Sequence, residues 1–157
     1  MNHFQVTSNA FVNNGAIPKK YTGFGEDISP EFNLKNVCAE AVSIAIIMDD
    51  LDVPFVKAFN HWVVWNIPKT DVITENIKYG ERTDNPKGAV QGIGWGKNGY
   101  RGPKQPPFIH KAHRYVFQFY VLDTMLGIGA NSTKKELLKA MDGHILQCAE
   151  ITGVYKP

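Results

Sequence analysis

Three stretches of the chain have the hydrophobic pattern of buried β-strands. Residues 41–48 form a continuous apolar run, rich in isoleucine and interrupted only by Ser43. Residues 61–67 (HWVVWNI) and 115–122 (YVFQFYVL) mix aromatic with β-branched residues, and Pro68 ends the first of these runs. Such runs are typical of strands that are covered on both faces. Residues 144–154 form a fourth candidate strand, whose polar residues indicate partial exposure.

One helix and several loops complete the pattern. Thr133 and Glu136 have the spacing of a capping box, and apolar side chains follow on one helical face at positions 137, 138 and 141. Gly143 then offers a place for the helix to end. The section from 69 to 107 is rich in glycine and proline and is expected to form loops with short strands. The pattern predicts a mainly β chain organised as a single domain over residues 1–157.

Composition limits the classes of protein to which the chain can belong. Its 157 residues suit one hydrophobic core, and 43% hydrophobic with 20% charged residues is ordinary globular usage. It contains no apolar run of eighteen residues, so stable membrane insertion is not expected. The N-terminal residues lack a secretory signal, and the two cysteines, Cys38 and Cys148, are too few for a disulfide scaffold. A cytoplasmic location is therefore expected.

The charge is nearly balanced overall but is unevenly distributed. Seventeen basic and fifteen acidic residues give a net charge of +2, which argues against a general nucleic-acid binder. Between Lys97 and Arg114 there are five basic residues, two histidines and no acid. Such a segment attracts anions, although a solvated basic loop has the same composition.

Polar side chains lie where the predicted strands end. Asp50 and Asp52 follow the first buried strand, His61 begins the second, and His113 and Tyr115 begin the third. Strand ends of this kind are compatible with one shared site, although sequence alone does not show that they converge. A carboxylate that accepts a hydrogen bond from an imidazole fixes its tautomer and favours the charged ring. Two such rings, with a tyrosine hydroxyl and loop amides, would bind phosphate or carboxylate.

Other signatures do not hold. Residues 94–99 match GxGxxG, but Pro103 follows closely and no helix can begin there, so a dinucleotide-binding motif is not supported.

The side chains of the candidate strand 61–67 are expected to alternate between its two faces. Strict alternation puts His61 on the same face as Val63 and Trp65. No short-spaced ligand pair anchors a metal, so neither a metal nor a cofactor is expected. A metal-dependent hydrolase that uses Asp50, His61 and His113 stays as the alternative function.

In these residues the chain resembles the phosphatidylethanolamine-binding protein family. The family has a DPxxP-type motif, a strand that begins with histidine and an aromatic residue, a Gly-Pro loop and a GxHR motif. The counterparts here are residues 50–54 (DLDVP), 61–68 (HWVVWNIP), Gly102–Pro103 and 113–115 (HRY). Leu51 departs from the family's usual proline, and Lys111–Ala112 replaces the Gly-x that precedes the histidine.

The resemblance implies a Greek-key β-sandwich of two antiparallel sheets with a short helix near the C-terminus. It also implies a non-enzymatic binding module of the bacterial Raf kinase inhibitor-like type, which takes phosphate, phosphorylated side chains or phospholipid head groups. A kinase or protease is an implied protein partner, and bacterial members often form homodimers. The implied ligand-binding residues are Asp50, Asp52, Pro54, His61, Gly102, Pro103, His113 and Tyr115.

Three structural and functional expectations follow. Asp50, His61, His113 and Tyr115 should line one pocket, and the Val53–Pro54 bond, which the family places in a sharp turn, should be cis. If both histidines hold the anion, at least one ring should be protonated in the complex. Anion binding should then weaken as the pH rises from about 6 to 8.

Overall fold

The isoleucine-rich run forms the central strand, β4 (Ser43–Asp50), of a six-stranded sheet. In this computed structural model, which describes residues 3–157, β4 is antiparallel to a neighbour on each side. The sheet order is β2-β9-β8-β4-β5-β7, and only the β2–β9 pair is parallel among its described pairings. The other strands are β5 (Phe59–Pro68), β8 (His113–Leu122), β9 (Ile145–Tyr155), β7 (Val90–Gln91) and β2 (Gly15–Ala16).

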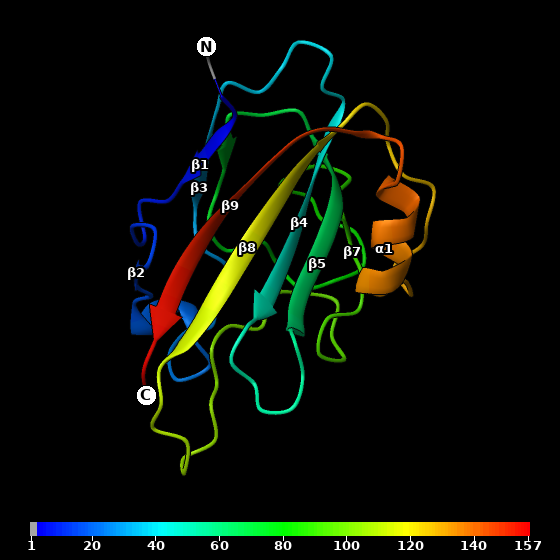
Figure 1. Ribbon diagram of the computed structural model, residues 1–157. Helices are drawn as coiled ribbons and strands as arrows, with labels where there is room; N and C mark the ends of the chain where they lie inside the picture. The colour runs from blue at the N-terminus through cyan, green and yellow to red at the C-terminus, as the bar shows by residue number, and fades with distance from the viewer. Residues whose placement is uncertain (1–2) are drawn as a thin grey trace.

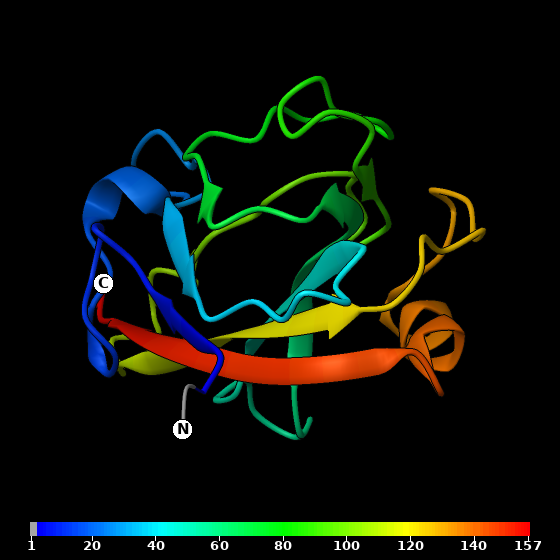
Figure 2. The same cartoon turned by 90° about the horizontal axis from the view of Figure 1, so that it is seen from above.

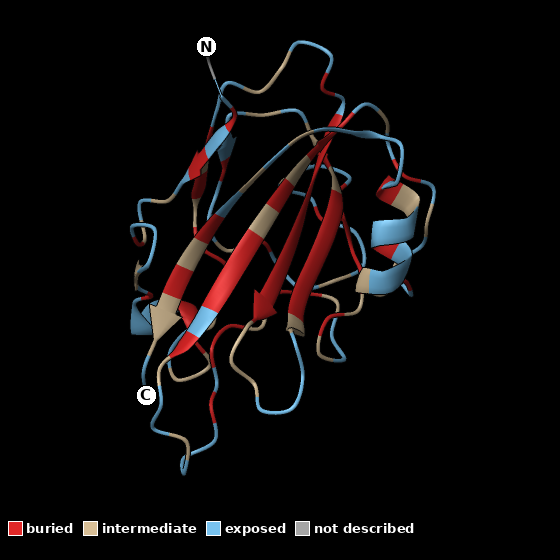
Figure 3. Ribbon diagram, viewed as in Figure 1, coloured by how far each residue is buried: buried red, intermediate tan, exposed pale blue. Residues whose placement is uncertain are grey.

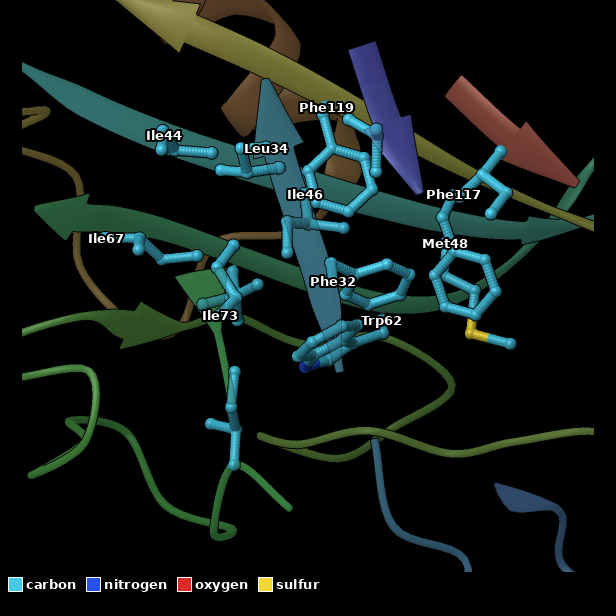
Figure 4. Packing of buried hydrophobic residues seen from close by; sticks show 14 of the residues in the cluster. Phe32, Leu34, Ile44, Ile46, Met48, Trp62, Ile67, Ile73, Phe117 and Phe119 are labelled. Atoms are coloured by element: carbon cyan, nitrogen blue, oxygen red, sulfur yellow. The ribbon is translucent and has the colours of Figure 1, made fainter. Parts of the chain in front are cut away.

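A smaller sheet covers one face of the large one (Figure 2). Its order is β1-β3-β6, and its strands are β1 (Gln5–Thr7), β3 (Phe32–Lys35) and β6 (Val72–Ile73). Phe32 packs between the sheets against the rings of Phe117 and Phe119, with centroid distances of 5.2 and 4.9 Å (Figure 4). The mainly β sandwich of two sheets is therefore confirmed.

The opposite face of the large sheet carries the helix α1 (Lys134–Met141) (Figure 1). Leu137 and Met141 are fully buried there against Trp65 and its neighbours, as the predicted apolar face requires. The expected capping box differs in detail, because the Thr133 hydroxyl donates to the Glu136 carboxylate instead of capping a backbone amide. Within residues 3–157, no helix has both the length and the apolar character that a membrane span requires.

The central strand is buried along its whole length because a layer packs on each of its faces (Figure 3). Ile44, Ile46 and Met48 belong to the core between the sheets, while Ala45 and Ile47 face the helix. This explains the continuous apolar run, since neither face of β4 meets water. The rigid frame ends at Asp50, where the chain leaves the sheet.

Candidate functional site

Three neighbouring strands bring their polar residues to one end of the large sheet. Strand β4 ends at Asp50, while its antiparallel neighbours β5 and β8 begin at Phe59 and His113. The register places Asp50 opposite Phe59 on one side and opposite Tyr115 on the other. The loops at residues 51–58 and 101–112 leave from this same end (Figure 1).

A β-bulge turns His61 toward the site. Met48 pairs with Trp62 and Asp49 pairs with Asn60, so His61 is an extra residue between two consecutive pairs. An extra residue breaks the alternation of side chains along a strand. His61 therefore lines a cavity with Tyr115, and the expectation that it shares a face with Val63 and Trp65, which pack under the helix, was wrong.

The polar residues surround a cavity of about 210 Å³. A water molecule takes up about 30 Å³ of the liquid, so this volume equals that of roughly seven waters and suits only a small ligand. As predicted, Asp50, His61, His113 and Tyr115 all line it. The other lining residues are Val53, Pro54, Phe59, Trp95, Lys104, Gln105, Pro106 and Ile109.

His113 and Asp50 form a buried pair in the wall of the cavity. The Nδ1 atom of His113 lies 2.7 Å from Asp50 Oδ2, and both side chains are at most 5% exposed. The other carboxylate oxygen of Asp50 accepts the backbone N–H of Asp52 at 2.8 Å. Because a carboxylate accepts, Nδ1 carries the hydrogen, and Nε2 is the nitrogen of His113 that is left for a ligand.

Tyr115 lies between the two histidines. Its ring centroid is 5.4 Å from that of His61 and 6.4 Å from that of His113. Burial, followed by the charge of the nearby Asp50 carboxylate, raises the pKa of the Tyr115 hydroxyl well above its usual range. The hydroxyl therefore stays protonated at ordinary pH and can donate a hydrogen bond.

His61 is anchored to an uncharged partner. Its Nδ1 atom lies 2.6 Å from the carbonyl oxygen of Arg101, which can only accept, so Nδ1 carries the hydrogen. The residue is 3% exposed, and burial lowers the pKa of its ring although the hydrogen bond to Arg101 and the charge of Asp50 oppose this shift. His61 is therefore not the ring that we expect to carry a positive charge.

The same peptide group that accepts from His61 is held from its other side by Asp27. The carbonyl belongs to Arg101 and the N–H to Gly102, and this N–H donates to Asp27 Oδ1 at 2.8 Å. Burial raises the pKa of Asp27, while the Gly102 N–H and the charge of Arg101 oppose that shift. Asp27 and His61 thus fix one peptide plane between them.

Three of the predicted residues, Asp52, Gly102 and Pro103, are not among the residues that line the cavity. The Asp52 carboxylate accepts two hydrogen bonds at 3.0 Å from the Arg114 guanidinium, and the pKa of Asp52 is lowered mainly by this partner. Gly102 binds Asp27, and the carbonyl of Pro103 accepts the Gly23 N–H at 2.8 Å. These residues shape the loops beside the cavity, and their role in binding a ligand stays a prediction.

The loop after β4 differs from the expectation. The cis peptide bond within the described residues is Asn85–Pro86, so the prediction that Val53–Pro54 is cis was wrong. The loop instead reverses at Phe55, whose φ of 68° lies in the left-handed region. Pro54 still reaches the cavity wall as predicted.

Aromatic and basic residues complete the wall and the rim. Trp95 packs 4.9 Å from the His61 ring, and the Arg101 guanidinium stacks 3.8 Å from the Trp95 ring centre. Lys104, from the basic segment, also lines the cavity, while its ammonium lies 4.2 Å from the centre of the Phe24 ring. Phe55 is fully exposed and Phe108 is 80% exposed on the two loops that flank the cavity.

The site does not have the arrangement of a metal centre. No group of three histidine, cysteine, aspartate or glutamate side chains that could hold a metal ion occurs within residues 3–157. The geometry therefore gives no support to the metal-dependent hydrolase that the sequence left as an alternative.

A search for related sequences identifies the family. The model of the phosphatidylethanolamine-binding protein family matches residues 7–156. This chain belongs to that family. A UPF0098 protein of Pyrococcus abyssi is 41% identical over 150 residues, which cover 95% of this chain and 83% of the relative. A UPF0098 protein of Chlamydia muridarum is 40% identical over 154 residues, which cover 97% and 98% of the two chains.

Solved structures of phosphatidylethanolamine-binding proteins agree with this fold. A homologue from Chlamydia trachomatis superposes with a TM-score of 0.86 at 37% identity and covers 100% of this chain and 99% of its own. YbcL of E. coli, described as a member of the mammalian family, gives 0.87 at 28% identity, with 99% of each chain covered. A carboxypeptidase Y inhibitor, solved with its proteinase, shares the fold alone, with a TM-score of 0.57 at 18% identity over 99% of this chain and 83% of its own.

Sequence reasoning missed several residues of this phosphatidylethanolamine-binding protein site. Phe59 and Ile109 are apolar residues in loops or at strand edges, and no motif distinguishes them from other surface residues. Lys104 lay within the predicted basic segment, but nothing separated it from the other lysines there. Asp27 gave no local signal, because its partner Gly102 is distant in sequence.

Proposed function

We propose that the cavity binds small anionic groups, such as phosphate, phosphorylated side chains or phospholipid head groups. The observation that carries this proposal is the convergence of two donors, His113 and Tyr115, on one small cavity that His61 and Lys104 also line. Hydrogen bonds from charged donors to an oxyanion are among the strong ones in proteins. Both oxygens of the buried Asp50 already accept hydrogen bonds, from His113 Nδ1 and from the Asp52 amide, so the ligand meets the His113 ring and not a bare carboxylate.

The proposal assigns different tasks to the polar groups. In the proposed complex His113 acts as an imidazolium, which donates through Nε2 to the anion and through Nδ1 to Asp50. Tyr115 donates through its hydroxyl, and Lys104 adds a flexible charge at the entrance. The apolar remainder of the wall excludes water, which strengthens each of these interactions.

Calorimetry of the purified chain tests this proposal. Inorganic phosphate is titrated into the wild type, into His113→Ala and into His144→Ala as a matched control. His144 also places its Nδ1 atom 2.8 Å from a carboxylate, that of Asp123, but it is exposed and lies outside the cavity wall. We expect at least a tenfold loss of affinity for His113→Ala and none for His144→Ala. Equal affinity in all three proteins contradicts the proposal.

The exposed rim favours a second function for the same site, the regulation of a protein partner that carries the anion. Phe55 and Phe108 are exposed beside the cavity and do not line it. Exposed aromatic side chains at a mouth of this kind are typical of protein contacts. A partner such as a kinase or protease would be retained by the wild type and lost by Phe55→Ser/Phe108→Ser, whereas phosphate affinity stays unchanged. Retention of the partner by the double variant contradicts this function.

A further inference from the structure

The two histidines of the cavity are anchored in opposite ways. His113 donates through Nδ1 to the carboxylate of Asp50, whereas His61 donates through Nδ1 to the peptide carbonyl of Arg101. A charge on His113 has a negative partner in direct contact. A charge on His61 would face a neutral group, in a residue that is only 3% exposed.

The peptide that holds His61 cannot easily turn away. Its carbonyl faces the His61 ring, and its N–H donates to Asp27 Oδ1 at 2.8 Å. A Cβ on Gly102 would lie 2.2 Å from the carbonyl oxygen of Tyr21, so the chain is closely packed at this point. The carbonyl therefore stays in place and holds the hydrogen of His61 on Nδ1.

The Nε2 atom of His61 is consequently a hydrogen-bond acceptor. Among the described residues His61 forms its side-chain hydrogen bond through Nδ1, and the ring lines the cavity. In the neutral ring, the nitrogen without a hydrogen offers a lone pair. In the proposed complex the cavity then offers an acceptor at His61 together with donors at Tyr115 and at the His113 imidazolium.

The charged groups around His61 agree with a neutral ring. From β4 it is faced by Asp50 and, farther off, by Asp49, both of which favour the charged form. From the 101–112 loop the Arg101 carbonyl raises the pKa of His61 through its hydrogen bond and the Arg101 charge lowers it, and burial outweighs the groups that raise it. The aromatic rings of Trp95, Phe59 and Tyr115 occupy the remaining contacts.

We infer that the cavity selects oxyanions that keep a hydroxyl of their own, such as hydrogen phosphate, over oxyanions without one, such as sulfate. The inference rests on the proposed anion-binding function and narrows its ligands to inorganic phosphate and to phosphomonoesters that keep one proton, because a phosphodiester head group has no hydroxyl to donate. Hydrogen phosphate places an unprotonated oxygen on His113 and Tyr115 and donates its hydroxyl to His61 Nε2. Sulfate must place a lone pair against the lone pair of His61. A buried acceptor without a donor is costly, which gives such sites their selectivity.

Calorimetry at pH 7.5 tests the selectivity with two pairs of anions. Phosphate and sulfate are both tetrahedral and mainly doubly charged at this pH, and only phosphate carries a hydroxyl. Arsenate and selenate repeat the comparison with larger anions. We expect the hydroxylated member of each pair to bind at least about tenfold more tightly, which corresponds to about 1.4 kcal/mol.

Two variants assign the selectivity to His61. His61→Asn keeps a nitrogen donor for the Arg101 carbonyl but removes the acceptor at Nε2, so the preference should fall to about twofold or less. His144→Asn is the control, because it makes the same replacement beside Asp123 and should keep the wild-type preference.

The outcomes separate the two proposals. If phosphate and sulfate bind the wild type equally, the selectivity is refuted while the anion-binding function stands. If neither anion binds, the anion-binding function fails and the selectivity fails with it. If His61→Asn retains the full preference, a group other than His61 supplies the acceptor and the inference is overturned. The comparison of anions in the wild type remains decisive even if His61→Asn does not fold.

Discussion

Replacing Gly102 by alanine tests how closely the loop beside the cavity is packed. A Cβ at this position would lie 2.2 Å from the carbonyl oxygen of Tyr21, 2.8 Å from Asp27 Oδ1 and 2.9 Å from the Tyr100 hydroxyl. The φ angle of Gly102 is not in the left-handed region, so the expected effect is steric and not one of backbone conformation. The loop must move away from Tyr21 to make room for the methyl group.

The expected loss of stability follows from the contacts that this movement breaks. Two hydrogen bonds meet here, from the Gly102 N–H to Asp27 at 2.8 Å and from the Tyr100 hydroxyl to the Tyr21 carbonyl at 2.6 Å. Each contributes about 1 kcal/mol, and overpacking costs about 1–3 kcal/mol. Allowing for relaxation, we expect the free energy of unfolding to fall by about 2–4 kcal/mol, a large share of the ~5–15 kcal/mol usual for a domain.

Urea unfolding measures this loss, with Gly127→Ala as the matched control. Gly127 has no heavy atom within 4 Å of the added Cβ, so the free energy of unfolding of that variant should stay within about 0.5 kcal/mol of the wild type. Phosphate affinity should also fall in Gly102→Ala, because the Arg101 carbonyl moves relative to His61. A Gly102→Ala protein as stable as the Gly127→Ala protein would refute the steric argument.

Three further substitutions probe the pair, the buried histidine and the helix. Asp50→Asn removes the carboxylate charge beside His113. It should lower the free energy of unfolding in urea by about 1–3 kcal/mol and weaken phosphate binding measured by calorimetry. Unchanged values in both assays contradict the role of the Asp50–His113 pair. Because burial lowers the pKa of His61, the unfolded chain takes up a proton more readily below about pH 6.5, so stability should fall from pH 7.5 to 5.5. Urea unfolding at both pH values should show a smaller fall in His61→Asn, and an equal fall argues against a neutral buried ring. Leu137→Ala should cost about 2–5 kcal/mol in urea unfolding, and the exposed Leu138→Ala less than about 1 kcal/mol; similar losses contradict the predicted helix face.

The strands and the helix could be predicted because their causes are local. The apolar run that becomes β4 is explained by a strand that is covered on both faces. The spacing of Leu137 and Met141 is explained by a helix that is covered on one face only. The site residues Asp50, His113 and Tyr115 were also found, because each lies at the end of such a strand. Neighbouring antiparallel strands then bring these ends together without further information.

The rest of the site depends on contacts between distant segments. Asp27 and Gly102 are 75 positions apart, and no local pattern links them. The path of the 51–58 loop was predicted from a family motif, whereas its turn is made at Phe55 by a positive φ angle. Packing between distant segments determines which residues meet in the cavity wall. Because these contacts are not local, they leave no signature in the pattern of the sequence.

The orientation of His61 shows why the chemistry of the site was harder to predict than its location. Alternation along β5 would bury His61 under the helix, and a single extra residue between the Met48 and Asp49 pairs reverses this. The reversal places the ring between the Arg101 carbonyl and the cavity, where it is shielded from water and lacks a direct acidic partner. Of the carboxylates that the sequence suggested would favour a charged ring, Asp50 is in direct contact with His113 and not with His61. The difference between an acceptor at His61 and a donor at His113 thus arises from one β-bulge, and the selectivity for hydroxyl-bearing anions depends on it.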